Sequence, residues 1–130
     1  MHRRRDPLFT LSWSLLAVTG AAILAFGIVT TLWPGTDERL YIRAVGVASV
    51  GLGLFGVMIT LIPFRGGERW AWMTLWYYPA FWLAHLLGGL PPGNDHIHQI
   101  VFIVFSASGL MLAIGRFPSL TPEPPAGTTD

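Results

Sequence analysis

A stretch of 26 residues without a charged side chain, from Leu8 to Trp33, constrains this chain more than any other feature of its sequence. The hydrocarbon core of a bilayer is about 30 Å thick, and about 20 helical residues are needed to cross it. Trp13 and Trp33 lie 20 residues apart, which is about 30 Å along a helix and matches the two aromatic belts of a membrane. The stretch therefore predicts a membrane-spanning helix.

Three further apolar segments follow, so the chain is expected to cross the membrane four times. Backbone groups in lipid must be hydrogen-bonded within the chain, which predicts helices. Only 12% of the residues are charged, about half the usual share of a soluble domain. The sequence thus predicts an all-α, integral membrane, four-helix up-down bundle and excludes a soluble globular enzyme. The predicted spans cover residues 8–33, 41–63, 70–90 and 97–115, between an Arg-rich N-terminus at 1–7 and a disordered tail at 117–130.

The arginines predict the orientation of these spans. Six of them are expected on one side of the membrane and two on the other, and basic residues are retained in the cytoplasm. Both termini are therefore expected to be cytoplasmic. All eight basic residues are Arg and none is Lys, as is typical of a GC-rich bacterial genome, so the expected location is a bacterial plasma membrane. The six are Arg3, Arg4, Arg5, Arg65, Arg69 and Arg116, and the two are Arg39 and Arg43.

Small residues recur along the second predicted span with spacings of 3, 4, 3 and 4. Such a stripe allows close backbone approach between helices in lipid. It indicates either packing within the chain or an interface with an identical or different subunit, so a homo-oligomer or a larger membrane complex remains open. The stripe, called the small-residue seam below, consists of Gly46, Ser49, Gly53, Gly56 and Thr60.

The third predicted span carries most of the side chains with possible chemistry. Seven aromatic residues lie between Trp70 and Trp82. Pro79 removes the N–H that would bond to the carbonyl of Leu75, so a kink is expected there. His85 falls about 22 Å along the helix from Trp70, in the outer leaflet. Ionisable residues within a span are functional candidates by default.

These residues predict a candidate site at the outer end of the bundle. One interpretation is structural, with Arg43 paired to an acidic residue of the first outer loop. Another is a site for a lipid head group, a quinone or another amphiphile, in which Arg43 binds an oxygen while His85 and Tyr78 orient it or move a proton. The candidate ligand-binding residues are Arg43, Tyr78, His85, Trp82 and Glu38.

A third interpretation of the outer end is a metal site. Imidazoles and a carboxylate are suitable ligands for zinc or copper, and the candidates are Asp95, His96 and His98. A bis-histidine haem is disfavoured, because His85 and His98 are poorly matched in depth. The absence of cysteine excludes disulfides and iron–sulfur clusters. No cofactor is expected, although a metal or a quinone is possible.

No catalytic motif accompanies these residues. The chain lacks a phosphate loop and HExxH, and no Asp or Glu falls within a predicted span. With a net charge of +1, a nucleic-acid partner is excluded, and membrane lipids are the expected partners. The leading interpretation is a small non-catalytic subunit or a module that binds a lipophilic ligand. The alternative is a small membrane enzyme or redox accessory that acts on a lipid or quinone through Arg43, Tyr78 and His85.

The plan of four short helices resembles that of small bacterial membrane proteins of the DoxX-like type. The resemblance covers the hydropathy of nearly the whole chain. Its one specific stretch is the turn between the second and third spans, residues 64–72, with the sequence FRGGERWAW. It implies a four-helix membrane fold and assigns no catalytic residue.

Overall fold

The chain folds entirely into helices and turns within the part that the structure describes. This computed structural model describes residues 6–35, 39–90 and 96–117, and no strand occurs among them. The all-α prediction is confirmed. The helices are α1 (Pro7–Leu32), α2 (Arg39–Ile59), η1 (Thr60–Phe64), α3 (Arg69–Leu75), α4 (Tyr77–Leu87), α5 (Ile97–Leu112) and η2 (Ile114–Arg116).

Three of the helical segments are long and apolar enough to cross a membrane. They are α1, the continuous run from Arg39 to Phe64, and the run from Ile97 to Arg116. The third predicted span differs, because it consists of α3 and α4, with 7 and 11 residues. Together with Trp76 these two helices form one bent rod over residues 69–87, called the α3–α4 rod below.

Proline chemistry explains the bend in this rod. Pro79 has no N–H to offer the carbonyl of Leu75, and its ring crowds the preceding turn. The helix is interrupted at Trp76, whose N–H instead bonds to Met73 O at 3.3 Å. The expected kink is therefore present, three residues before the proline. Pro63 has a related effect in η1, where the helix widens to a π-helix over Thr60–Phe64.

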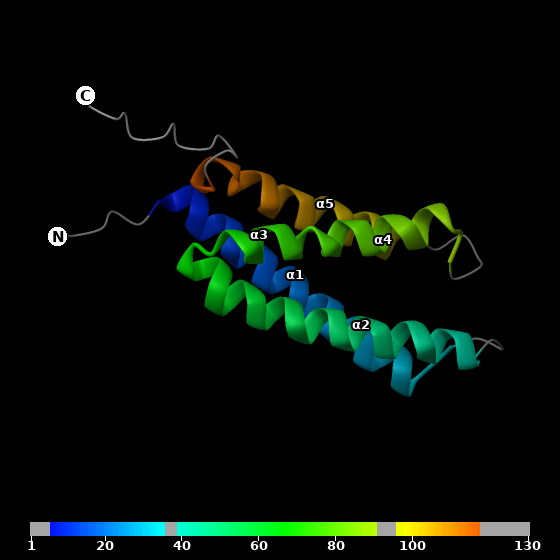
Figure 1. Ribbon diagram of the computed structural model, residues 1–130. Helices are drawn as coiled ribbons and strands as arrows, with labels where there is room; N and C mark the ends of the chain where they lie inside the picture. The colour runs from blue at the N-terminus through cyan, green and yellow to red at the C-terminus, as the bar shows by residue number, and fades with distance from the viewer. Residues whose placement is uncertain (1–5, 36–38, 91–95, 118–130) are drawn as a thin grey trace, which may run out of the picture.

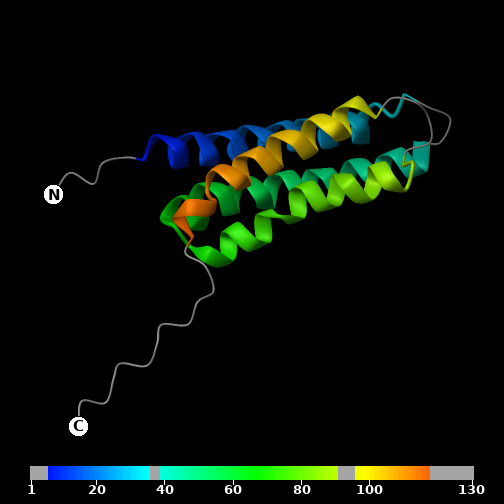
Figure 2. The ribbon, with the colours of Figure 1, turned by 90° about the horizontal axis from the view of Figure 1, so that it is seen from above.

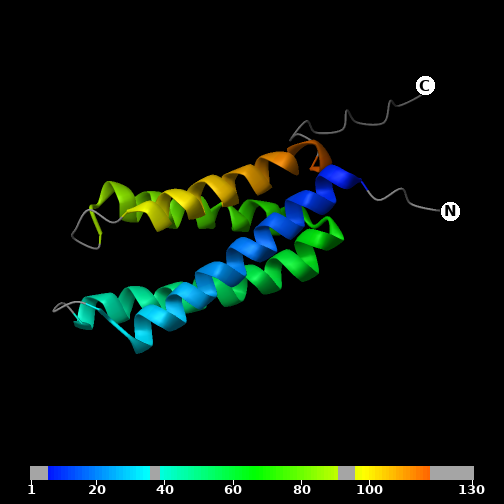
Figure 3. The same cartoon turned by 180° about the vertical axis from the view of Figure 1, so that it is seen from behind.

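The helices form an up-down bundle in which neighbours in sequence run antiparallel (Figure 1). Helix α1 packs on α2 and α5, and α4 packs on α5. Helix α2 meets the α3–α4 rod near α3, whereas α2 and α4 do not pack closely on each other. Helices α1 and α5 pack together along one edge of the bundle, called the closed edge, whereas α2 and α4 make few contacts along the other, called the open edge. Figure 2 gives the view from above, and Figure 3, from behind, shows the α1–α2 pair and the α4–α5 pair separating toward the end where α5 begins.

The small-residue seam holds α1 and α2 together. Gly46, Gly53 and Gly56 are buried, as are Ser49 and Thr60. A Cβ atom placed on Gly53 would lie 2.5 Å from the backbone nitrogen of Leu24, and one on Gly27 would lie 2.5 Å from that of Val50. The two helices therefore touch backbone to backbone, and the seam serves packing within the chain.

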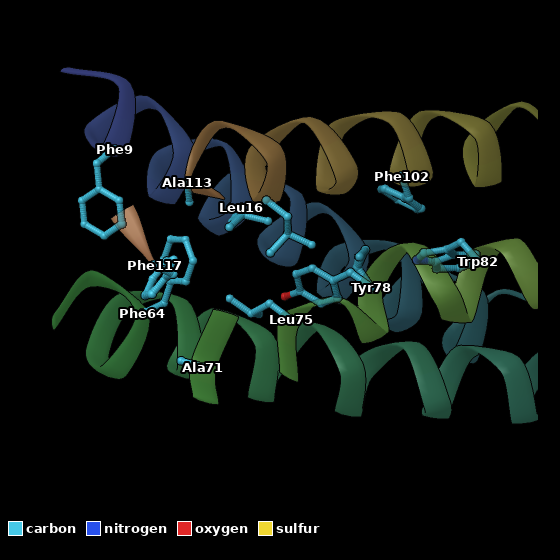
Figure 4. Packing of buried hydrophobic residues seen from close by; sticks show 12 residues of the cluster. Phe9, Leu16, Phe64, Ala71, Leu75, Tyr78, Trp82, Phe102, Ala113 and Phe117 are labelled. Atoms are coloured by element: carbon cyan, nitrogen blue, oxygen red, sulfur yellow. The ribbon is translucent and has the colours of Figure 1, made fainter. Parts of the chain in front are cut away.

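An aromatic cluster closes one end of the bundle. Phe9, Phe64 and Phe117 pack against one another with ring centroids 5.5–6.4 Å apart (Figure 4). Trp72 stacks on Phe117 at 5.8 Å and donates a hydrogen bond from Nε1 to Leu110 O at 3.1 Å. Phe117, the first residue of the predicted tail, is thus buried in this cluster.

Two arginines lie over rings at the same end. The guanidinium carbon of Arg65 is 4.9 Å from the centre of the Trp13 ring, and that of Arg116 is 4.4 Å from the centre of the Phe9 ring. Such cation–π contacts keep the charged heads at the rim while the rings stay in the apolar interior. We call this the basic end, and the opposite end, where α4 finishes and α5 begins, the far end.

Candidate functional site

A groove runs along the open edge of the bundle, between α2 and the α3–α4 rod. Its volume is about 310 Å³, at the lower limit of small-molecule sites in proteins. One wall carries the aromatic rings of Tyr77, Tyr78 and Phe81, and the opposite wall is α2. None of the lining residues is charged. On the α2 side they are Ala48, Gly51, Leu52, Phe55, Gly56 and Ile59, and on the other side Thr74, Leu75, Tyr77, Tyr78 and Phe81.

Small residues on α2 make room for the groove. Gly51 lies outside the small-residue seam, and a Cβ atom placed on it would meet nothing within 4 Å. Ala48 lines the same wall one turn earlier. Larger side chains at these positions would project into the groove. From the sequence alone, Gly51 only adds one more small residue to the second predicted span. Whether it faces open space depends on where the α3–α4 rod lies.

Tyr78 joins the groove to the interior of the bundle. The side chain is 1% exposed, and its hydroxyl points into a notch between α1 and α2 (Figure 4). The notch exists because Gly20 and Gly56 have no side chains: a Cβ atom on either would overlap the tyrosine hydroxyl. The two glycines therefore fix the depth to which the ring enters the bundle.

The hydroxyl of Tyr78 has no hydrogen-bond partner among the described residues, and neither has Oγ1 of Thr60. Both side chains are buried. An unsatisfied buried polar group costs about 1–3 kcal/mol. The groove thus has a polar but unsatisfied group behind its inner wall, and this group adds nothing to the stability of the fold.

Trp82 and His85 continue the aromatic wall toward the far end. Trp82 is 1% exposed and packs against Phe26 of α1 and Phe102 of α5, with centroids 5.6 and 5.0 Å away. Half-buried His85 lies 4.3 Å from the Phe81 ring and 5.7 Å from the Trp82 ring. Trp82 is therefore a core residue between three helices, and His85 lies at its edge.

Arg43 does not join these residues. Arg43 is exposed and precedes Ala48 by five residues, which places it about 140° around α2 from the groove wall. Glu38 lies outside the described residues. The structure therefore brings Tyr78, Trp82 and His85 together on one rod and leaves Arg43 on another face of the bundle.

The two candidate metal ligands that the structure describes, His96 and His98, have different surroundings. His98 stacks on Phe26 with centroids 4.8 Å apart and lies 5.8 Å from the Trp82 ring. His96 is half-buried just before α5, and Asp95 lies outside the described residues. Within residues 6–35, 39–90 and 96–117, no three His, Cys, Asp or Glu side chains gather closely enough to hold a metal ion.

Comparisons with known proteins add no further assignment to this geometry. No protein-family model, no curated protein and no solved structure matches the chain. The groove, the buried tyrosine behind it and the histidine beyond it are therefore the observations from which a function is argued.

Proposed function

We propose that this chain is a small, non-catalytic membrane protein that holds the hydrocarbon chain of a membrane lipid in the groove between α2 and the α3–α4 rod. The observation that carries the proposal is the groove itself, an apolar, uncharged hollow on the open edge of a bundle with three helices long enough to span a membrane.

The depth of the groove favours hydrocarbon as its occupant. Gly51 lies 12 residues after Arg39 and 13 residues before Phe64, at the middle of the run from Arg39 to Phe64. If this run crosses a bilayer, the groove lies near the midplane, where the protein is surrounded by the acyl chains of lipids. Lipid head groups do not reach this depth, and the absence of charge along the lining suits an apolar guest.

The width of the groove favours a single chain over a helix. From Ala48 to Ile59 the groove extends about 16 Å along α2. A helix about 10 Å across and 16 Å long occupies about 1,200 Å³, several times the volume of the groove, which is about 310 Å³. A hydrocarbon chain in van der Waals contact is about 4 Å across, whereas a helix with its side chains is about 10–12 Å across.

The proposed orientation has both termini in the cytoplasm of a bacterium and the basic end at the inner face of the plasma membrane. Arg65 and Arg116 lie at the same end of the bundle as the start of α1, and three more arginines precede α1 in the sequence. This asymmetry supports the orientation, since basic residues are retained on the cytoplasmic side.

The proposal is tested by photocrosslinking in lipid bilayers. A phospholipid with a diazirine at the middle of one acyl chain is incorporated with the purified protein, illuminated, and the adducts are located by mass spectrometry. We expect adducts concentrated on the groove walls, between residues 48–59 and 74–81. An even distribution over all lipid-facing surfaces would contradict a specific site.

Gly51→Leu provides the sharpest variant, because Gly51 lines the groove and a Cβ atom placed on it would meet nothing within 4 Å. We expect it to remove the groove adducts while leaving the fold intact. Ala25→Leu on an exposed surface of α1 is the control, since it also adds bulk to a lipid-facing helix. If both variants crosslink like the wild type, the groove does not hold the chain.

A further inference from the structure

The hydrogen bond that His85 makes within α4 determines which of its ring nitrogens can accept a hydrogen bond from a ligand. Nδ1 lies 2.9 Å from the carbonyl oxygen of Phe81, one turn earlier in α4. A carbonyl oxygen only accepts hydrogen bonds, so Nδ1 carries the proton in this contact. In the neutral imidazole the lone pair is therefore on Nε2, which accepts a hydrogen bond from a donor such as a hydroxyl group.

His85 extends the groove wall toward the far end. It follows Tyr78 and Phe81 by 7 and 4 residues, so the three side chains share one face of α4, and its ring contacts that of Phe81. The imidazole lies about 6 Å beyond Phe81 along the helix axis. A chain in the groove would pass His85 as it leaves toward the far end.

Tyr41 occupies the corresponding position on α2. It precedes Ala48 and Phe55 by 7 and 14 residues, which places it on the groove face of the helix, about 10 Å beyond Ala48. Tyr41 is half-buried, and its hydroxyl both donates and accepts hydrogen bonds. Beyond the residues that line the groove, α2 and α4 thus each carry one uncharged polar side chain toward the far end, whereas Arg43 lies on a different face.

The basic end offers no comparable exit. There α3 packs on η1 and on α2, and the aromatic cluster of Phe9, Phe64 and Phe117 fills the space between the helices. A chain in the groove must therefore place its head group toward the far end. Within the described parts of α2 and α4, the groove faces present a tyrosine and a histidine toward the far end and no arginine or acidic residue, so charge complementarity favours an uncharged head group.

We infer that the guest of the groove is a neutral lipid with a hydroxyl head group, which donates a hydrogen bond to His85 Nε2 and accepts one from the hydroxyl of Tyr41. The inference rests on the proposed function and names the class of lipid. Its head lies in the outer leaflet in the proposed orientation. A groove of about 16 Å with a further 6–10 Å to these side chains suits an extended chain of about 18–22 carbons, at about 1.2 Å per bond.

Competition against the photoactivatable lipid tests the head group. Octadecanol, octadecane and octadecyl phosphate are added at increasing concentrations, and loss of groove adducts is measured. One hydrogen bond changes affinity by about two- to tenfold. We therefore expect the concentration of octadecanol that removes half of the groove adducts to be at least about twofold lower than that of octadecane. Octadecyl phosphate is expected to be no better than octadecane.

Three variants separate the head group from the chain. His85→Phe and Tyr41→Phe keep a ring of similar size and remove the polar atom, so each is expected to reduce the advantage of octadecanol while octadecane competes as before. Arg43→Gln is the control and is expected to leave the order of the three competitors unchanged. An advantage of octadecanol that survives in both aromatic variants would overturn the inference.

The outcomes also distinguish this inference from the proposed function. If Gly51→Leu removes the groove adducts but octadecanol and octadecane compete equally, the groove holds a chain and the head-group inference is wrong. If octadecyl phosphate competes best and Arg43→Gln abolishes this, an anionic lipid is the guest and the inference is wrong as well. If the adducts are insensitive to Gly51→Leu, the proposed function itself fails.

Discussion

Two glycines of α2, only two residues apart, offer a stringent test of the packing described here. A Cβ atom on Gly53 would lie 2.5 Å from the backbone nitrogen of Leu24 and 2.7 Å from its Cα atom, whereas one on Gly51 would meet nothing within 4 Å. Carbon atoms pack at about 3.5–4.0 Å, so Gly53→Ala must push α1 and α2 apart by about 1 Å. Gly51→Ala requires no movement.

The magnitude follows from the difference between the two variants. Both make the same substitution in the middle of one helix, so the gain in helix propensity of about 0.8–1 kcal/mol cancels between them. Overpacking a tight contact costs about 1–3 kcal/mol. We therefore expect Gly53→Ala to be less stable than Gly51→Ala by about 1–3 kcal/mol, with Gly51→Ala at least as stable as the wild type.

The free energy of unfolding is measured by titrating sodium dodecyl sulfate into the protein in mild detergent and following tryptophan fluorescence. Equal unfolding curves for the two variants would refute backbone contact between α1 and α2. Leu24→Ala serves as the control for a side-chain clash. It is not expected to rescue Gly53→Ala, because the closest atoms belong to the backbone and Cβ of Leu24, which alanine retains.

Three further predictions concern the buried hydroxyl of Tyr78, the hydrogen bond of Ser12 and the orientation of the bundle in the membrane. Tyr78→Phe is expected to leave the free energy of unfolding unchanged or to raise it by up to about 1–3 kcal/mol, since the hydroxyl is buried without a partner; a clear loss of stability in the same titration would contradict this. Ser12→Ala removes the hydrogen bond from Oγ to Gly109 O at 2.6 Å and is expected to cost about 0.6 kcal/mol; no loss would show that the bond is not formed. Because the chain has no cysteine, Gly35→Cys and Gly66→Cys can be labelled singly in intact cells. An impermeant maleimide is expected to reach Gly35→Cys alone, and the reverse pattern would invert the proposed orientation.

The packing of α1 and α2 could be anticipated from the sequence because it depends on residue size at helical spacing. Gly46, Ser49 and Gly53 recur on one face, and whichever neighbour covers that face must come close. The sequence did not identify the neighbour. That α1 fills the role follows from details such as Gly27, which lies against Gly46 and Val50 in the structure.

The break in the α3–α4 rod was predictable in kind because Pro79 acts locally. A missing N–H and a bulky ring affect the carbonyl four residues earlier whatever the rest of the fold does. The extent of the break depends on the neighbours. Trp76 is half-buried and its ring lies 6.0 Å from that of Trp72, so the turn between α3 and α4 is also held by side-chain packing.

The shape of the groove could not be predicted, because it depends on how far apart α2 and α4 lie when their closest contact is that of Tyr78 with Gly56. The sequence predicted a lipophilic site that includes Tyr78, but the opposite wall, with Ala48 and Phe55, was not anticipated, since sequence patterns do not give the distance between two helices. For the same reason Arg43 was grouped with His85 by depth alone. Depth in a membrane is set by residue number, whereas the direction of a side chain around the bundle depends on how each helix is rotated.

The position of the groove opposite the closed edge has a mechanical consequence. The hydrogen bond between Ser12 and Gly109 and the stacking of Phe26 on His98 both join α1 to α5. Drawing α2 away from α4 turns the α1–α2 pair about this line relative to the α4–α5 pair and leaves both contacts in place, while the Tyr78 hydroxyl is withdrawn from its notch beside Gly20 and Gly56. The depth to which this ring enters the bundle can then vary with the thickness of the guest, so that straight and methyl-branched chains are admitted by one architecture.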